Sequence, residues 1–451
     1  MTDSHREPAA QQPPQKLKRV LNMWDAAALI VGIIIGSGIF AVPPSIARDL
    51  DSFLPLIGVW VAGGVLALAG ALTYAELSTM FPRTGGPYVF LHETYGPFPA
   101  FAYGWSAILI TYPASMAAVA VFFAITLSHW VPMSSAGQSA VASGLCIVVA
   151  LLNTLGVKLG ARVQRALTAA KVLAISAIPI FGFLLMKGDV ANFTPVAAAP
   201  SGGWSLTAMA LAMAAVMWTF EGWADAPTLA GEVTDLKRDI PRALILGTVG
   251  VMVIYVAVNA AYVYLLGIEG IAASEGVAPD AAAAVFGPAG AIGVTALILV
   301  STASSLNAMT ISGSRVVFAM SQDGLFLKSA GSVHRRFETP AVALIVLGVI
   351  GAIYAALGTF EQIIRYFVFV AMIWFSLNIL AVFILRRKRP NADRPFRVPL
   401  YPVTPAIFLG SALGLMIQLY RDNTRDAIVG LILIALSIPI YLVWKRLGRS
   451  R

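Results

Sequence analysis

The sequence predicts an all-α integral membrane protein with twelve transmembrane helices, and three observations lead to this fold class. Of its 451 residues, 58% are hydrophobic and only 12% are charged, whereas soluble domains carry about a quarter charged residues. Apolar stretches recur along the whole chain, and a stretch of roughly 20 residues is enough to cross a bilayer as a helix. Basic residues gather in alternate turns between these stretches.

The twelve predicted spans cover most of the chain. They lie near 22–47, 53–80, 97–130, 137–156, 163–186, 205–231, 241–267, 285–319, 340–358, 361–385, 402–420 and 427–444. Residues 1–19 are polar and contain proline and glutamine, so we expect a disordered cytoplasmic tail without a cleavable signal peptide. The sequence shows no P-loop, so the energy for any transport must come from gradients or exchange.

The distribution of Lys and Arg predicts the orientation. With the N-terminus in the cytoplasm, the termini and the even-numbered turns hold most of the 31 basic residues. The exceptions are Arg48, Lys187, Arg365, Arg421 and Arg425 in the opposite turns, and Lys171 and Arg315 within or at the ends of spans. This positive-inside bias places both termini in the cytoplasm of a cell membrane. The net charge of +9 is thus a topology signal, and the expected partners are the lipid bilayer and no nucleic acid.

Cysteine and histidine usage argue against two kinds of site. The single cysteine, Cys146, excludes a disulfide framework and a cysteine-based metal cluster. The four histidines, His5, His92, His129 and His334, show no metal-binding spacing. We therefore expect neither a metal nor a cofactor.

Two spans contain residues that disfavour a continuous helix. The first reads GIIIGSGIF at 32–40, and the sixth reads MWTFEGWADAPTLAG at 217–231. Lipid cannot satisfy freed backbone groups, so a helix broken at that depth must line a protein cavity. Broken helices at corresponding positions of two halves are typical of the substrate sites of secondary transporters. For the sixth span, a packed helix with a proline kink is the alternative.

Five segments together resemble the amino acid–polyamine–organocation superfamily, and within it the L-type amino acid transporter group. They are GIIIGSGIF, FEGW followed by GEVTDLKRDIPRA, GVKLGARVQRALTAAKVLA, SSLNAMTISGSRVVFAMSQDGLF and RPFRVPLYPVTP. Their order matches the family, and the resemblance spans about residues 18–445. It implies a LeuT-type 5+5 inverted repeat with broken helices 1 and 6. The repeats would cover 20–200 and 201–390, with helices 11 and 12 and the C-terminal tail in 391–451.

The resemblance implies amino acid transport by alternating access, and the first break offers suitable chemistry. Backbone N–H groups of Ser37, Gly38 and Ile39 would bind the substrate carboxylate, because free donors and the helix dipole point there. Carbonyls near Ile34 would accept from the substrate ammonium. The alternative is a small-residue packing motif between helices.

The sixth span adds two candidates. By the resemblance, Trp218 lies where the family places an aromatic gate over the substrate, and its carbonyl and that of Glu221 would complete the ammonium site; core packing is the alternative. Glu221 is an ionisable group in mid-membrane, which suggests function. It would contact substrate, relay a proton or cap freed backbone, and a structural role also stays open.

Lys171 lies inside the apolar fifth span. In sodium-coupled relatives of this fold, a sodium ion sits between helices 1, 5 and 8, so the resemblance implies that the Lys171 ammonium replaces the ion. Ser301, Ser304 or Ser305 would face it. A buried lysine can also carry a proton, and a snorkelling lysine is the third interpretation. Tyr112 and Asn307 are further pocket candidates.

The lead hypothesis is a carrier of neutral L-amino acids that works by proton symport or exchange. The alternative is a carrier of cationic amino acids or polyamines, with Glu221 holding the distal positive charge. A channel would need a continuous polar pore, and a membrane enzyme would need a cluster such as histidine with carboxylates. The spans offer neither.

Overall fold

The computed structural model describes residues 19, 21–155, 157–194, 205–334, 337, 339–358 and 360–448, so nearly all of the predicted tail lies outside the described residues. The described part of the chain is helical and contains no sheet, and one isolated parallel bridge joins Leu21 and Val233. The all-α class that the apolar stretches predict is confirmed.

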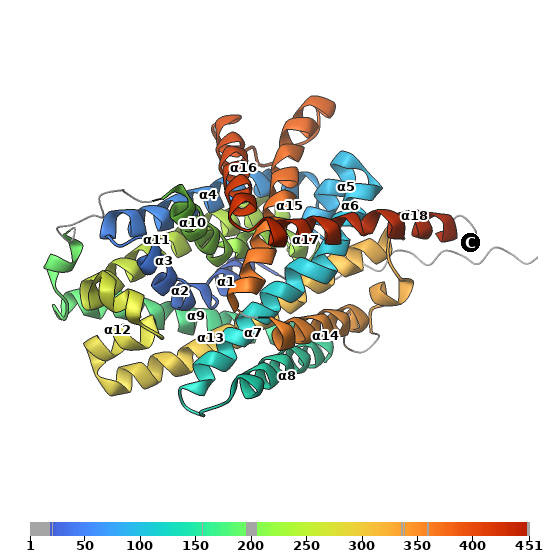
Figure 1. The fold of residues 1–451 in the computed structure, drawn as a ribbon. Helices are drawn as coiled ribbons and strands as arrows, with labels where there is room; N and C mark the ends of the chain where they lie inside the picture. The colour runs from blue at the N-terminus through green and yellow to red at the C-terminus, as the bar shows by residue number, and fades with distance from the viewer. Residues whose placement is uncertain are drawn as a thin grey trace, which may run out of the picture.

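The helices follow one another along the chain as Figure 1 shows, with short 3₁₀ or π segments marked η. They are α1 (Met23–Ile34), α2 (Gly38–Ala41), α3 (Pro43–Asp49), α4 (Phe53–Met80), α5 (Pro87–Tyr95), α6 (Pro97–Ser106), η1 (Ala107–Thr111), α7 (Tyr112–Ser128), α8 (Ser135–Thr154), α9 (Val157–Leu184), η2 (Val190–Phe193), α10 (Leu206–Thr219), η3 (Glu221–Ala224), η4 (Ala226–Glu232), α11 (Leu236–Ala273), α12 (Val277–Phe286), α13 (Pro288–Gln322), η5 (Lys328–Gly331), α14 (Ala341–Leu357), α15 (Phe360–Lys388), α16 (Val403–Asp422), α17 (Thr424–Ala435) and α18 (Ser437–Gly448).

Ten helical segments among the described residues are long and apolar enough to cross a membrane. A further pair, Leu206–Thr219 with Glu221–Glu232, is long and apolar enough to cross the membrane when its two parts are taken as one span. The pair is bent by 49° at its break, and counting it gives up to eleven spans. The remaining predicted span falls on α14, which is apolar but only 17 residues long. A helical multi-pass membrane protein is therefore shown, and the count of twelve stays a prediction.

The start of α1 is fixed by local chemistry. Asn22 and Asp25 form a capping box, in which each side chain accepts a hydrogen bond from the backbone N–H of the other at 3.0 and 3.1 Å. Such a box satisfies two of the free donors at a helix N-terminus. Asp25 also pairs with Arg165 of α9 at 2.9 Å. Both contacts hold the helix that contains the first break.

The two broken helices meet inside the bundle. Figure 1 shows α1 and α2 at its centre, where α1 packs against α9, α11, α13 and η3. A Cβ atom added to Gly222 would lie 2.6 Å from the backbone nitrogen of Ile34, and one added to Gly38 would lie 2.6 Å from the Thr219 side chain. Glycine at these two positions therefore permits the close approach of the two breaks.

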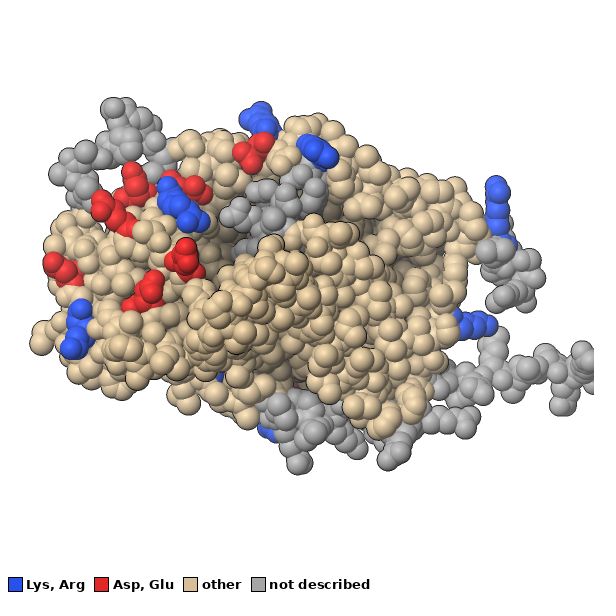
Figure 2. Space-filling model, turned by 60° about the horizontal axis from the view of Figure 1, so that its bottom comes forward, with Lys and Arg blue, Asp and Glu red and all other residues tan. Residues whose placement is uncertain are grey.

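The outer surface suits a lipid environment. Large apolar side chains such as Leu173, Val253 and Leu413 are exposed on helices that are long and apolar enough to cross a membrane. On the face seen in Figure 2, a broad surface without charged residues crosses the middle of the molecule, and most of the acidic residues in view gather toward the left end. An exposed apolar belt of this kind is expected where a protein faces hydrocarbon.

The segment between α15 and α16 is anchored by a buried carboxylate. Glu76 of α4 is fully buried and accepts hydrogen bonds from Arg386 at 2.6 and 3.0 Å and from the Val398 N–H at 2.8 Å. The Arg386 guanidinium also lies 3.8 Å from the centre of the Tyr401 ring. This linker is therefore a packed part of the fold.

Candidate functional site

The first break leaves backbone donors free in the protein interior. Helix α1 ends at Ile34 and α2 begins at Gly38. Among the hydrogen bonds of the described residues, none has the N–H of Ser37, Gly38 or Ile39 as its donor. Ser37 is 1% exposed, and its hydroxyl has no partner in the described part of the structure. Buried backbone groups are nearly always paired, so these donors suit an anionic ligand.

The carbonyls on the other side of the break are held by Lys171. Its Nζ donates to the carbonyls of Gly32 at 2.8 Å and Ile35 at 2.9 Å, and it lies 3.3 Å from the Ser305 hydroxyl. Ser305 and Ser301 also donate to these carbonyls, whereas Ser304 donates to Gln164. The lysine side chain is 1% exposed, so it does not reach an aqueous surface. The geometry places an ammonium between α1, α9 and α13.

Tyr255 is a contact of the break that the sequence analysis did not identify. Its hydroxyl donates to the Ile34 carbonyl at 2.7 Å from α11. Ile34 is one of the predicted acceptors for a substrate ammonium. The Gly36 N–H also donates to this carbonyl at 2.8 Å, so both of its lone pairs are engaged in this conformation. Nothing in the local sequence of α11 marks Tyr255, because the contact joins residues 221 apart.

The second break follows Trp218. The Phe220 N–H at the end of α10 donates to the Val216 carbonyl at 3.0 Å and also faces the Trp218 carbonyl. The Trp218 side chain is 6% exposed and does not line the cavity described next. Its role as a gate stays a prediction.

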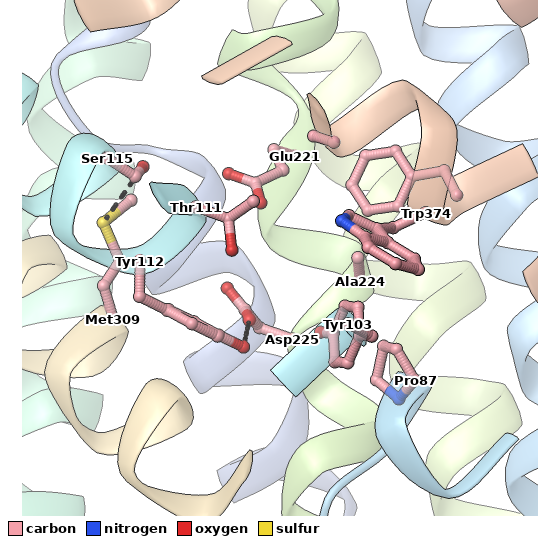
Figure 3. Close-up of a pocket in the computed structure, with 12 residues that line it drawn as sticks. Pro87, Tyr103, Thr111, Tyr112, Ser115, Glu221, Ala224, Asp225, Met309 and Trp374 are labelled. Carbon is pink, nitrogen blue, oxygen red and sulfur yellow. Dashed lines mark hydrogen bonds between the residues drawn. The ribbon is translucent and has the colours of Figure 1, made fainter. Parts of the chain in front are cut away.

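A cavity of about 20 Å³ lies beside the second break (Figure 3). Its walls come from α5, α6, η1, α7, η3, α13 and α15, and from Asp225 between η3 and η4. The lining residues are Pro87, Tyr103, Thr111, Tyr112, Ser115, Glu221, Ala224, Asp225, Met309, Ala371, Trp374 and Phe375. The volume is enough for one water-sized group.

Two carboxylates line this cavity, and the sequence analysis named only one of them. Asp225 is 5% exposed and accepts a 2.6 Å hydrogen bond from the Tyr112 hydroxyl. The Glu221 side chain forms no hydrogen bond with the other residues that line the cavity (Figure 3). Asp225 was visible in the same broken segment, four positions after Glu221. The structure therefore brings Glu221 and Tyr112 together, as predicted pocket candidates, with Asp225 added.

Other candidates lie elsewhere. The Asn307 side chain accepts a 2.7 Å hydrogen bond from Asn153 of α8 and does not line the cavity. Glu232 forms a buried ion pair with Arg315 at 3.0 Å. The described residues contain no group of three or more His, Cys, Asp or Glu side chains that could hold a metal ion.

The chain matches known proteins along nearly its whole length. The family model described as amino acid permease matches residues 21–442. The b(0,+)-type amino acid transporter 1 of Homo sapiens is 31% identical over 396 residues, which cover 86% of this chain and 81% of that protein. The serine/threonine exchanger SteT of Bacillus subtilis is 30% identical over 436 residues, covering 95% and 98%. The cystine/glutamate transporter of Homo sapiens is 30% identical, covering 99% and 89%.

These matches agree with the sequence segments and with the apolar helical bundle. The family model covers both breaks, Lys171 and the cavity. The chain therefore belongs to the amino acid permease family of the amino acid–polyamine–organocation superfamily, and it is a membrane transporter of amino acids rather than an enzyme.

Proposed function

We propose that this protein carries neutral L-amino acids across the cell membrane by alternating access, as a proton symporter or an exchanger. The observation that supports this proposal best is the first break, where the N–H groups of Ser37, Gly38 and Ile39 have no acceptor among the described residues. The carboxylate of an α-amino acid would bind these donors, and its ammonium would replace one of the two donors to the Ile34 carbonyl, Tyr255 or Gly36. Helix termini attract such charges through both their free groups and their dipoles.

The proposed topology has twelve spans. The ten long segments, the bent pair and α14 would supply them. The spans would divide into repeats at 20–200 and 201–390, followed by the last two helices in 391–451. The distribution of basic residues supports cytoplasmic termini in this arrangement.

Lys171 is proposed as a permanent substitute for a bound sodium ion. Its ammonium donates to two carbonyls of the first break at 2.8 and 2.9 Å, as a coordinated cation would contact them. It therefore stabilises the broken conformation that presents the substrate-binding groups. Transport would then need no sodium.

One observation favours the alternative substrate class of cationic amino acids or polyamines. Glu221 and Asp225 both line the cavity, and no Lys, Arg or His belongs to its described lining. A distal ammonium or guanidinium of a substrate would neutralise this negative charge. In that case Glu221→Gln would weaken recognition of lysine, arginine or polyamines far more than recognition of alanine or leucine.

Counterflow in proteoliposomes tests the proposed function. Liposomes are loaded with an unlabelled neutral amino acid, and entry of a labelled one is measured with and without a competitor panel of neutral and cationic amino acids and polyamines. We expect saturable exchange that neutral amino acids compete for. Competition by cationic compounds alone would instead support a carrier of cationic amino acids or polyamines. If no compound of the panel exchanged, both substrate classes would be contradicted.

A further inference from the structure

We propose that Glu221 and Asp225 together hold one transferable proton, and that this carboxyl pair couples transport to the proton gradient. The inference rests on the proposed function and deepens it, because it locates the coupled proton at the second break. Lys171 is then a fixed charge, and the proton-carrying group is a different one.

The charges around the cavity require a neutralising group. Two carboxyl groups line the same enclosed space of about 20 Å³, and its described lining has no basic side chain. Two negative charges at close range in a poorly solvated site repel strongly, so one of them must bind a proton or a cation. Two buried basic side chains, Lys171 of α9 and Arg315 of α13, are engaged elsewhere, Lys171 with the α1 carbonyls and Arg315 with Glu232.

Trp374 supplies an independent observation about the occupant. It is 4% exposed, and its Nε1–H has no partner among the described residues. It lines the cavity, and Figure 3 shows the indole nitrogen directed toward Glu221 and Thr111. An indole N–H can only donate, so its partner must have an acceptor.

This donor discriminates between the two ways of neutralising the pair. An ammonium or guanidinium has no acceptor and would face the Trp374 N–H donor to donor. A water-sized occupant can accept from Trp374 and donate to both carboxyl groups, and the cavity volume suits one water. The remaining neutralising group is then a proton. It enters when hydronium protonates a carboxylate and leaves water, and it departs by the reverse transfer.

The hydrogen bonds indicate which carboxyl group holds the proton in this conformation. The Tyr112 hydroxyl donates to Asp225 at 2.6 Å, which stabilises a carboxylate there. No other residue that lines the cavity donates a hydrogen bond to the Glu221 side chain (Figure 3). Glu221 is therefore the protonated member. The other titratable groups that face the pair are Tyr74 of α4 and Tyr103 of α6, which interact with it electrostatically.

The pair lies where a conformational change would alter it. Glu221 directly precedes Gly222, which contacts the first break at Ile34, whereas Tyr112 belongs to a different helix, α7. Movement of the broken segment relative to α7 would change the Asp225–Tyr112 hydrogen bond and the access of water to the cavity. A proton could then be taken up on one side and released on the other.

Two assays on the reconstituted full chain separate coupling from transport. One is counterflow of a neutral amino acid at equal pH on both sides. The other is accumulation into substrate-free liposomes that are more alkaline inside by one pH unit. For one proton per substrate, this gradient supports about a tenfold accumulation. We expect the wild type to accumulate substrate to that level.

Glu221→Gln and Asp225→Asn should abolish accumulation above equilibrium while counterflow remains measurable. Glu221→Asp and Asp225→Glu, which keep a carboxyl group, should restore part of the accumulation. Ser143→Ala, which removes a partly buried hydroxyl of α8 outside the cavity, should accumulate like the wild type. This set distinguishes a proton site from a change in packing.

The opposite results are equally clear. A wild type that exchanges amino acids but does not respond to the proton gradient would overturn the proton site and leave the proposed function standing. Loss of the proton drive in Lys171→Ala, with the drive intact in Glu221→Gln, would move the site to Lys171. Selective loss of competition by lysine or a diamine in Glu221→Gln would make the pair a distal-cation site instead.

Discussion

Ser37 contributes both a backbone N–H and a hydroxyl to the first break, and mutation can separate them. Ser37→Pro removes the N–H at a residue whose φ of −86° is close to the proline range. A lost hydrogen bond to a charged group corresponds to about 1.5–3 kcal/mol, so we expect substrate affinity to fall roughly ten- to a hundredfold. Ser37→Ala keeps the N–H and should stay near the wild type. Binding to purified protein measures both.

Ser37→Pro is a better test than Gly38→Val. A Cβ at position 38 would meet Thr219 at 2.6 Å, so a valine there would disturb packing as well as the binding groups. Equal affinity in Ser37→Pro and Ser37→Ala would show that the N–H group does not bind substrate.

For Trp218, two substitutions distinguish a role as a gate over the substrate from a role in core packing. We expect Trp218→Ala to lose most transport and Trp218→Phe to keep part of it, because a flat ring closes the path to the substrate. Removing a buried tryptophan also destabilises a protein by about 3–5 kcal/mol. Thermal stability in detergent is therefore measured with transport. Similar transport by both variants, with reduced stability of the alanine variant, would identify Trp218 as core.

Ion pairs between elements differ in burial, which predicts different consequences. Glu232 of η4 and Arg315 of α13 form a 3.0 Å pair with side chains 6% and 2% exposed, whereas Lys237 and Asp393 form a 3.0 Å pair that is mostly exposed. Breaking a buried pair costs about 3–5 kcal/mol, and an exposed pair contributes about 0–1. Glu232→Gln should lower the melting temperature clearly, and Lys237→Gln should leave it nearly unchanged. Equal shifts would contradict this difference.

At the scale of helices, the sequence predicted the features that depend on residues adjacent in the chain, namely the positions of the helices and of their breaks. The apolar stretches matched the long helices within a few residues, and GIIIGSGIF and FEGWADAP marked both breaks because glycine and mid-membrane polar residues act locally. The partners across the breaks were not predictable in this way. Tyr112 and Asp225 are 113 residues apart, and Trp374 approaches them from α15. Such contacts depend on packing, which a single sequence does not display.

Over the whole molecule, Lys171 predicts the ion requirement of transport. We expect equal counterflow rates in sodium and choline media, because the proposed cation site is already filled by a side chain. Lys171→Ala should reduce transport severely, since the carbonyls of Gly32 and Ile35 lose their charged donor and keep only serine hydroxyls, and a hydrogen bond to a charged group corresponds to about 1.5–3 kcal/mol. Counterflow of the wild type and the variant in both media measures this. Strict sodium dependence of the wild type would contradict the assignment.

A cation that is covalently attached to α9 has no dissociation constant. In the proposed role, dilution of the medium, a change of salinity or an ionophore would leave the site occupied, and only chemical modification of the amine or loss of its proton would discharge it. The broken first helix would keep its shape in fresh and in saline water alike. Because this cation is never exchanged with the medium, it cannot couple transport to an ion gradient. Uphill uptake must therefore be coupled to a gradient through another group in the protein.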